Sequence, residues 1–410
     1  MSVFGCICIS TRTFCKSITQ NIFSTNKNLE IYRFCSKNLY STEIGPNLTK
    51  LVYSTMAPGK KVTVVGCGNW GTAAAKTISE NAAKFDLFDD TVRMWVLEEQ
   101  VDGMKLSEMI NTLHENKKYL PSIKLPHNLV AVPDLNECVK DADLFIFVIP
   151  HQFVKSTAAK IKASGNLKPD AVAISLIKGV AILDNKPVLI SDIIEEELGI
   201  PCAALSGANV ATCIANEEFS EATIGCADVE QARVWQRLFD RPYFKISCIK
   251  DPTGIQIYGA IKNVVALSAG FCDGLGLGSN TKAAIIRIGL KEIHRFAEEF
   301  FPAVSKDVVF ESAGVADLIT TCIGGRNVRC AAEFARHKGA RPWEEIEKEF
   351  LNGQKLQGVS TCAEVHEILK ACGKAALFPL FEVTHKISFE AADPSELIKA
   401  FSTEKLEPVL

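Results

Sequence analysis

Short apolar runs and amphipathic stretches alternate along the first half of the chain. Valine, isoleucine and other apolar residues dominate the runs, which is typical of strands buried on both faces. Helical patterns separate them, for example at 72–80 and at 187–198, where Asp184 or Asn185 is expected to cap the helix. This alternation predicts a parallel sheet covered by helices on both faces. The expected strands are residues 61–65, 92–96, 144–149, 171–176, 222–226 and 243–248.

The strand pattern stops near Lys250, and helical periodicity takes over. Thr361 and Glu364 are spaced as a capping box at the start of one of these helices. We therefore predict an α/β fold: a doubly wound Rossmann-type sheet domain at residues 57–249, followed by an all-helical C-terminal substrate domain at residues 250–405. The expected helices are residues 255–269, 281–300, 327–337, 343–351 and 361–371.

Length and composition agree with this division. A chain of 410 residues is too long for one ordinary core. The net charge of −3 gives no general attraction to nucleic acid, and no apolar run approaches 18 residues, so neither nucleic acid nor integral membrane association is expected. The 15 cysteines show no C-x-x-C spacing, which favours buried free thiols over a metal site or a disulfide framework. No metal is expected.

Residues 1–56 differ in composition from the rest of the chain. They contain six lysines and arginines against two glutamates, with frequent serine and threonine. This composition is typical of an organellar transit peptide, here one that would direct the chain to mitochondria. The alternative is an untranslated or disordered extension, because Met56 could serve as another start. Both interpretations place the segment outside the fold.

A glycine-rich turn follows the first expected strand. Gly66-Cys67-Gly68-Asn69-Trp70-Gly71 fits G-x-G-x-x-G and opens a helix, which is the context of a dinucleotide-binding loop. A glycine turn without a ligand is the alternative. Glu98 and Glu99 follow the second strand, where an acid accepts a ribose hydroxyl and repels the extra phosphate of NADP. The sequence therefore favours NAD.

Two lysines lie where a positive charge is costly. Lys178 follows a buried strand, at the edge where doubly wound sheets bind ligands, or alternatively extends its side chain from the strand end into solvent. Lys262 lies in a helix that is apolar almost all round, so it needs a partner or a lowered pKa. A general acid/base fits this position, and Asp317 is the candidate carboxylate partner. A buried structural ion pair is the alternative.

Gly324-Gly325-Arg326-Asn327 precedes another expected helix. The guanidinium fork and the helix N-terminus together suit a phosphate.

Long matching strings across the chain resemble the eukaryotic NAD-dependent glycerol-3-phosphate dehydrogenase family. They run in family order from about Lys60 to the C-terminus. Leu97 departs from the pattern, because many members have an aromatic residue there. The strings are 68–71 (GNWG), 114–116 (HEN), 118–121 (KYLP), 150–153 (PHQF), 175–179 (SLIKG), 207–209 (GAN), 262–266 (KNVVA), 270–276 (GFCDGLG), 316–322 (ADLITTC), 324–327 (GGRN) and 351–358 (LNGQKLQG).

The resemblance implies interconversion of sn-glycerol 3-phosphate and dihydroxyacetone phosphate. Lys262 would exchange the proton at the C2 oxygen, and Lys178 would contact the same substrate. Asn263, Asp317 and Thr321 would orient the reacting centre. A cytoplasmic homodimer is also implied. Arg326 and Asn327 would hold the substrate phosphate, and Phe153, Ala211, Arg326, Lys355 and Gln357 would contact NAD.

Two other functions compete with this one. A non-enzymatic dinucleotide sensor on the same fold would not need to retain Lys178, Lys262 and Asp317 together with Arg326. A dehydrogenase for another short 3-hydroxy acid is disfavoured, because the second anion site suits a phosphate.

Overall fold

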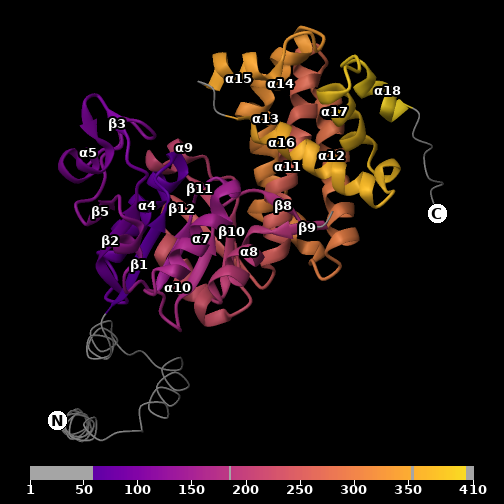
Figure 1. Cartoon of the computed structure of the whole chain (residues 1–410). Helices are drawn as coiled ribbons and strands as arrows, with labels where there is room; N and C mark the ends of the chain where they lie inside the picture. Colours follow the sequence, from indigo (N-terminus) through magenta and orange to yellow (C-terminus); the bar gives the residue numbers. More distant parts are fainter. Residues whose placement is uncertain (1–58, 184–185, 352–354, 403–410) are drawn as a thin grey trace, which may run out of the picture. The chain divides into compact units, whose positions relative to one another are not determined.

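An eight-stranded sheet forms the first half of the fold, as the apolar runs predict (Figure 1). The computed structural model describes residues 59–183, 186–351 and 355–402, so the predicted extension at 1–56 and the expected capping residues Asp184 and Asn185 lie outside it. The strand order is β12-β11-β10-β7-β6-β1-β2-β5. The strands are β1 (Lys60–Val65), β2 (Phe88–Trp95), β5 (Leu129–Val132), β6 (Leu144–Phe147), β7 (Val172–Ser175), β10 (Cys202–Ser206), β11 (Ser220–Gly225) and β12 (Phe244–Ile249).

All neighbouring strands pair in parallel except β10 and β11, which are antiparallel. The prediction of an all-parallel sheet is therefore wrong at this pair. The connection contains the five-residue helix α9 (Ala211–Ala215). Such a helix rises only about 7.5 Å, less than the roughly 17 Å length of a five-residue strand. It does not carry the chain back to the end of the sheet at which β10 begins, so β11 runs antiparallel beside β10.

Strand β1 lies at a switch point of the sheet. The chain continues from β1 to β2 and β5 on one side, and then returns to β6 and β7 on the other. The register pairs Val65 with Phe147, and Phe147 with Ser175, so these three strands end level with one another. The loops that follow β1, β6 and β7 consequently meet at one edge, where doubly wound sheets bind ligands.

Helices cover both faces of the sheet. Along β6, Phe145 and Phe147 pack in one apolar cluster with α7 (Val154–Ala163) and α8 (Ile190–Leu198). The alternate residues of β6 pack in another cluster with α4 (Asn69–Ala82) and α10 (Val229–Phe239). This explains why the strands are apolar without alternation. The smaller elements are α5 (Leu106–Leu113), α6 (Leu135–Val139) and the hairpin β3 (Gln100–Val101) with β4 (Met104–Lys105).

The helix expected at 187–198 is only partly present. Residues Lys186–Leu189 form strand β9, which pairs with β8 (Val180–Leu183) in a separate hairpin, and α8 begins at Ile190. Pro187 fits a two-stranded hairpin, because a strand with only one neighbour does not need every backbone donor. Leu189 is the N-cap residue of α8, and no side chain caps the helix there.

The second half is helical, as predicted, and begins with α11 (Pro252–Gly274), which is separated from the end of β12 by two residues (Figure 1). The expected capping box at Thr361 is wrong, because α16 begins four residues earlier and Thr361 is buried inside it. Helices α13, α17 and α18 lie outside the predicted ranges. The helices are α11 (Pro252–Gly274), α12 (Ser279–Phe300), α13 (Asp317–Gly324), α14 (Arg326–Arg336), α15 (Trp343–Leu351), α16 (Gln357–Ala371), α17 (Pro379–Phe389) and α18 (Glu396–Ser402).

Helix α11 is the centre of this helical half. It packs against α12, α13, α14, α16 and α17, and it also reaches β10 and β11 of the sheet. By length and composition it is apolar enough to cross a bilayer, but its most apolar window is completely buried inside the fold. Burial on all sides is the ordinary condition of a central core helix.

Candidate active site

The three glycines of the turn after β1 have different structural roles. Gly66 has a φ of +126°, and a Cβ there would lie 2.4 Å from the carbonyl oxygen of Val148. A Cβ on Gly71 would lie 2.3 Å from the carbonyl oxygen of Gly66. A Cβ on Gly68 would meet no atom within 4 Å. The first and last glycines are therefore required by packing, whereas Gly68 leaves an open surface that a ligand can approach.

Helix α4 starts at this turn with Gly68 as its N-cap, and no side chain caps it. Its first amide groups can therefore bind an anion. Hydrogen bonds to neighbouring side chains fix the turn. The Cys67 carbonyl accepts from Thr72 Oγ1 at 2.9 Å and from Asn116 Nδ2 at 3.0 Å. The side-chain Nδ2 of Asn69 donates to the Tyr119 carbonyl at 2.6 Å. Asn116 lies in a string matched to the family, but no role was predicted for it.

Trp70 lies at the same turn and packs edge-on against Phe244 of β12, with ring centroids 6.3 Å apart. Its indole nitrogen is buried and has no hydrogen-bond partner among the described residues. A buried donor of this kind is costly unless something accepts its hydrogen bond.

Glu98 and Glu99 both follow β2, but protein groups already occupy their oxygens. Glu98 accepts from the Ser107 amide at 3.2 Å and from its hydroxyl at 2.6 Å. Glu99 pairs with Lys118 and accepts from the Tyr119 hydroxyl at 2.6 Å. The hydrogen bond from Lys118, and then that from Tyr119, lowers the pKa of Glu99. Desolvation raises the pKa of Glu98, but the Ser107 hydrogen bonds outweigh it and the pKa falls. Both side chains therefore carry negative charge beside the glycine turn.

The buried lysine predicted in the central helix has the expected partner. Lys262 Nζ lies 2.6 Å from Asp317 Oδ1 and also donates a hydrogen bond to Thr321 Oγ1. Lys262 is 5% exposed, and the Asp317 side chain is 3% exposed. Asp317 and Thr321 are four residues apart on α13, so they face the same side of that helix.

An irregular segment places Asp317 at this position. Residues Ser312–Ala316 form a short π-helical turn, η3, in which Gly314 has non-helical angles of φ −86° and ψ −106°. A Cβ on Gly314 would lie 2.4 Å from the Val309 carbonyl oxygen. The turn leads directly into α13, whose first residue is Asp317. Turns of this type often occur at functional sites.

Lys178 reaches the same carboxylate from the sheet. Its Nζ lies 2.8 Å from Asp317 Oδ2, and it donates to the Gly207 carbonyl at 2.9 Å and to Asn209 Oδ1 at 3.0 Å. The two oxygens of Asp317 thus hold two ammonium groups that come from different halves of the chain. Gly207 and Asn209 were matched to the family without a role, and the structure shows that they orient Lys178.

The surroundings of Lys262 lower the pKa of its ammonium group. Burial is the largest effect and lowers its pKa, Asp317 raises it, and the nearby Lys178 lowers it again. The net result is a pKa of about 8, well below the usual 10.5. A group with a pKa near the working pH can both give and take a proton.

Next to Lys262, Asn263 begins a short polar chain across three helices. Asn327 Nδ2 donates to Asn263 Oδ1 at 3.0 Å, and the Gly358 amide donates to Asn327 Oδ1 at 2.9 Å. A Cβ on Gly358 would lie 2.8 Å from Asn327 Oδ1. These contacts join α11, α14 and α16. Arg326, the neighbour of Asn327, is exposed at the first position of α14, and no side chain caps that helix at Gly325.

The remaining residues expected at the cofactor are less closely connected. Phe153 is exposed at the end of η1 (His151–Phe153), and Ala211 packs with Ala73 of α4. Gln357 is the first residue of α16, and its Nε2 is buried with no hydrogen-bond partner among the described residues. Lys355 instead pairs with Glu347 at 3.0 Å. No described contact brings Lys355 to the glycine turn.

The family models cover most of this fold. Residues 61–232 match the NAD-dependent glycerol-3-phosphate dehydrogenase N-terminus, and residues 251–399 match its C-terminus. The human cytoplasmic glycerol-3-phosphate dehydrogenase [NAD(+)] is 51% identical over 340 residues, which are 83% of this chain and 96% of the relative. The chloroplastic enzyme 1 of Arabidopsis thaliana is 50% identical over 341 residues, 83% of this chain and 85% of the relative.

Solved structures agree with the sequence matches. The glycerol-3-phosphate dehydrogenase of Plasmodium falciparum superposes with a TM-score of 0.82 at 45% identity, over 85% of this chain and 97% of that chain. Both halves of the fold are thus shared with this family. The chain belongs to the NAD-dependent glycerol-3-phosphate dehydrogenase family, which confirms the predicted fold class, the NAD cofactor and the prediction of an oxidoreductase.

Proposed function

We propose that the chain interconverts sn-glycerol 3-phosphate and dihydroxyacetone phosphate, with Lys262 as the general acid/base. The observation that carries this proposal is the buried contact of Lys262 with Asp317 and Thr321, beside a second ammonium group from Lys178. A structural ion pair would need only one cation for one carboxylate. Two cations on one carboxylate leave excess positive charge, which suits a reaction that develops negative charge on oxygen.

In the oxidation direction, the neutral amine of Lys262 accepts the proton of the C2 hydroxyl, and the C–O bond becomes a carbonyl. The residues of the glycine turn would hold NAD, which would supply the hydride acceptor for C2. In the reduction direction, the ammonium of Lys262 donates its proton to the C2 oxygen as the hydride arrives. Asp317 and Thr321 hold the lysine in place in both directions, and Lys178 stabilises negative charge at the same oxygen.

Substrate recognition depends on the start of α14. Arg326 offers a planar fork of donors, and the uncapped first turn of α14 adds amide groups, so together they can bind the phosphate. Asn263, Asn327 and Thr321 would line the path between this phosphate and Lys262. Helix α11 carries both Lys262, at the reacting centre, and Asn263, on the path to the phosphate. It therefore sets the distance between the reacting centre and the phosphate-binding residues.

The glycine turn fits the cofactor pyrophosphate. Gly68 leaves room for it, and the uncapped start of α4 supplies donors. The buried unpartnered nitrogens of Trp70 and Gln357 are two further donors beside the expected position of NAD. Phe153, Ala211, Arg326 and Lys355 remain proposed cofactor contacts.

The test is a spectrophotometric assay of NADH oxidation with dihydroxyacetone phosphate. Lys262→Met should lower kcat by at least ~10²-fold, because general acid catalysis is typically worth that much. Lys262→Arg should not restore it, since a guanidinium does not release its proton. The matched control is Lys76→Met, which removes another buried lysine that pairs with Glu80 and Glu217. Equal losses of turnover in both variants, in step with melting temperature, would assign Lys262 a structural role instead.

We further propose that the active form is a cytoplasmic homodimer. Relatives from both the cytoplasm and the chloroplast match the chain, and the basic composition of residues 1–56 makes mitochondrial import the alternative. Light scattering gives the mass of the purified chain. A fluorescent fusion of residues 1–56 that enters mitochondria would decide for the alternative.

A further inference from the structure

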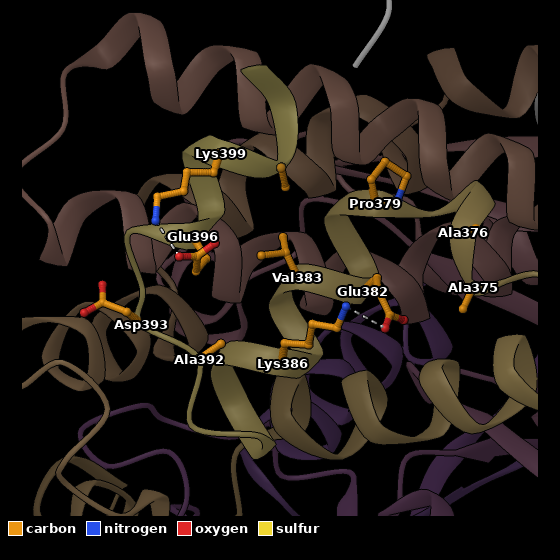
Figure 2. A pocket seen from close by; sticks show the side chains of 11 residues that line it. Ala375, Ala376, Pro379, Glu382, Val383, Lys386, Ala392, Asp393, Glu396 and Lys399 are labelled. Carbon is orange, nitrogen blue, oxygen red and sulfur yellow. Dashed lines mark hydrogen bonds and ion pairs between the residues drawn. The ribbon is translucent and has the colours of Figure 1, made fainter. Parts of the chain in front are cut away.

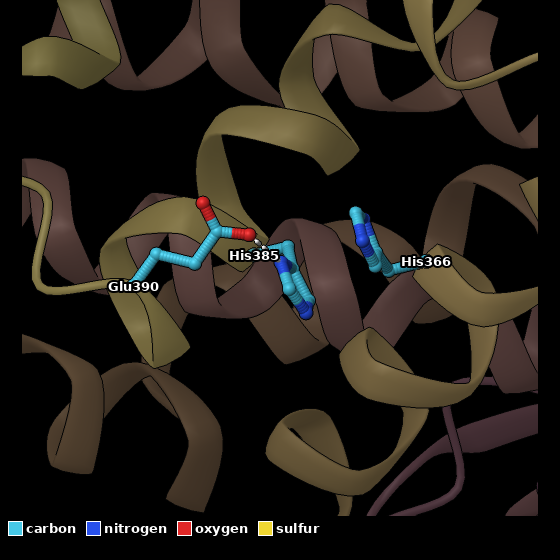
Figure 3. A group of neighbouring side chains, drawn as sticks. All are labelled: His366, His385 and Glu390. Carbon is cyan, nitrogen blue, oxygen red and sulfur yellow. Dashed lines mark ion pairs between the residues drawn. The ribbon is translucent and has the colours of Figure 1, made fainter. Parts of the chain in front are cut away.

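Two histidines and two glutamates gather on α16 and α17, outside the candidate active site. His366 comes from α16, and His385 and Glu382 come from α17. Glu390 follows directly as the C-cap of α17. Figure 3 shows that the two imidazole rings lie face to face, with Glu390 beside His385. One nitrogen of each ring and an oxygen of Glu390 lie within 4.8 Å of one another.

A carboxylate lies beside each ring. His366 Nδ1 lies 3.2 Å from Glu382 Oε2, and His385 Nδ1 lies 3.3 Å from Glu390 Oε1. Both ring nitrogens are buried, and neither has a well-aligned hydrogen-bond partner among the described residues. Such atoms are costly to bury, and an ion bound by the two rings and Glu390 would give each ring a partner.

The spacings suit a shared metal ion. Two ligand atoms about 2.1 Å from a tetrahedral zinc ion lie roughly 3.4 Å apart. The distance of 3.3 Å between His385 Nδ1 and Glu390 Oε1 is close to that value. The ligand types also discriminate between metals, because imidazole nitrogen with carboxylate oxygen suits zinc, nickel and copper better than magnesium or calcium.

The two imidazole rings are stacked, with centroids 3.5 Å apart and planes that differ by 8°.

We propose that His366, His385 and Glu390 bind one divalent transition-metal ion of the zinc type, which fastens α16 to α17. A metal lies close to the plane of each imidazole that binds it, and parallel stacked rings share no plane. One ring must therefore rotate when the ion binds, and the stack is broken. The ion would stabilise the fold and take no part in the reaction, because none of its ligands is proposed to contact substrate or cofactor.

A cavity lies beside the cluster. It has a volume of about 720 Å³ and runs along α17 and α18, and Glu382, the neighbour of His366, is part of its wall (Figure 2). Charges of both signs line this cavity, since Glu382 pairs with Lys386 and Glu396 pairs with Lys399.

The test uses the full-length chain, stripped of metal with a chelator. Titration with Zn²⁺ against a chromophoric chelator should show one equivalent bound at this site, and the melting temperature should rise because the ion binds only the folded state. His366→Gln and His385→Gln should each remove that equivalent and the rise in melting temperature. Glu390→Gln should weaken binding about tenfold or more, and Glu390 is partly exposed, so this variant should fold normally.

The matched control is His337→Gln, because His337 is an exposed histidine paired with Glu333 outside the cluster. It should bind zinc as the original chain does. The cysteines are a second possible set of zinc ligands, since those described are all free. Titration with Co²⁺ separates the two, because thiolate ligands give charge-transfer absorption that nitrogen and oxygen ligands lack. An undiminished equivalent in the His366→Gln and His385→Gln variants, or no binding by the original chain, would overturn the proposal.

Discussion

Lys262 changes its charge near neutral pH because burial opposes the ammonium form more strongly than Asp317 supports it. With a pKa of about 8, it is mainly an acid below that pH and mainly a base above it. For glycerol 3-phosphate oxidation, kcat/KM should rise by about tenfold per pH unit up to this pKa and then level off. For dihydroxyacetone phosphate reduction, kcat/KM should fall above it. Profiles that change in the same sense for both directions would contradict the assignment.

A substitution of the single residue Arg326 tests the proposed phosphate site. Arg326→Lys keeps the charge and loses the fork, so one charge-assisted hydrogen bond should be lost. KM for dihydroxyacetone phosphate should then rise by about tenfold or more. The control is unphosphorylated dihydroxyacetone, a poor substrate that should lose little further. If both substrates lose equally, Arg326 acts on the cofactor.

Single residues were predictable where burial conflicts with charge. A lysine and an aspartate in apolar helices need each other, so the Lys262–Asp317 pair followed from the sequence alone. Asn209 and the Gly207 carbonyl did not, because polar residues in a loop give no such conflict. Their contact with Lys178 depends on the meeting of the loops after β7 and β10.

At the scale of elements, two glycines of the turn at 66–71 test packing and ligand binding separately. Gly71→Ala would place a methyl group against the Gly66 carbonyl and should destabilise the fold by about 1–3 kcal/mol. Gly68→Ala has open space and ordinary backbone angles of φ −62° and ψ −176°, so it should leave the melting temperature unchanged. It should raise KM for NAD by about tenfold or more, because the methyl group occupies the approach of the pyrophosphate. A stable Gly68→Ala variant with normal KM would place the cofactor elsewhere.

Element types were predictable from periodicity, and their ends were not. The apolar runs gave the strands of the sheet, because strands buried on both faces have no alternation. The hairpin β8–β9 was mistaken for the start of a helix, since Pro187 suits a helix start as well as an edge strand. The π-helical turn η3 has no sequence signature, because tertiary packing against Val309 fixes Gly314 there.

For the whole molecule, the described fold begins at residue 59 and enters β1 at Lys60, and the basic composition of residues 1–56 predicts that they lie outside it. A chain that starts at Met56 should therefore fold and keep its full kcat and melting temperature. The control is a chain that starts at Val65, which lacks most of β1 and should be insoluble because β1 pairs with both β2 and β6. An inactive or insoluble Met56 chain would show that the extension supports the fold.

Asp317 lies in the helical half and holds Lys178 of the sheet half together with Lys262 of its own half. The proposed catalytic centre therefore needs residues from both halves. A gene that encoded either half alone would yield a protein with a nucleotide turn or a proton donor, but with no working enzyme. Selection can act on this chemistry only through the joined reading frame, so the two halves are expected to be inherited as one gene.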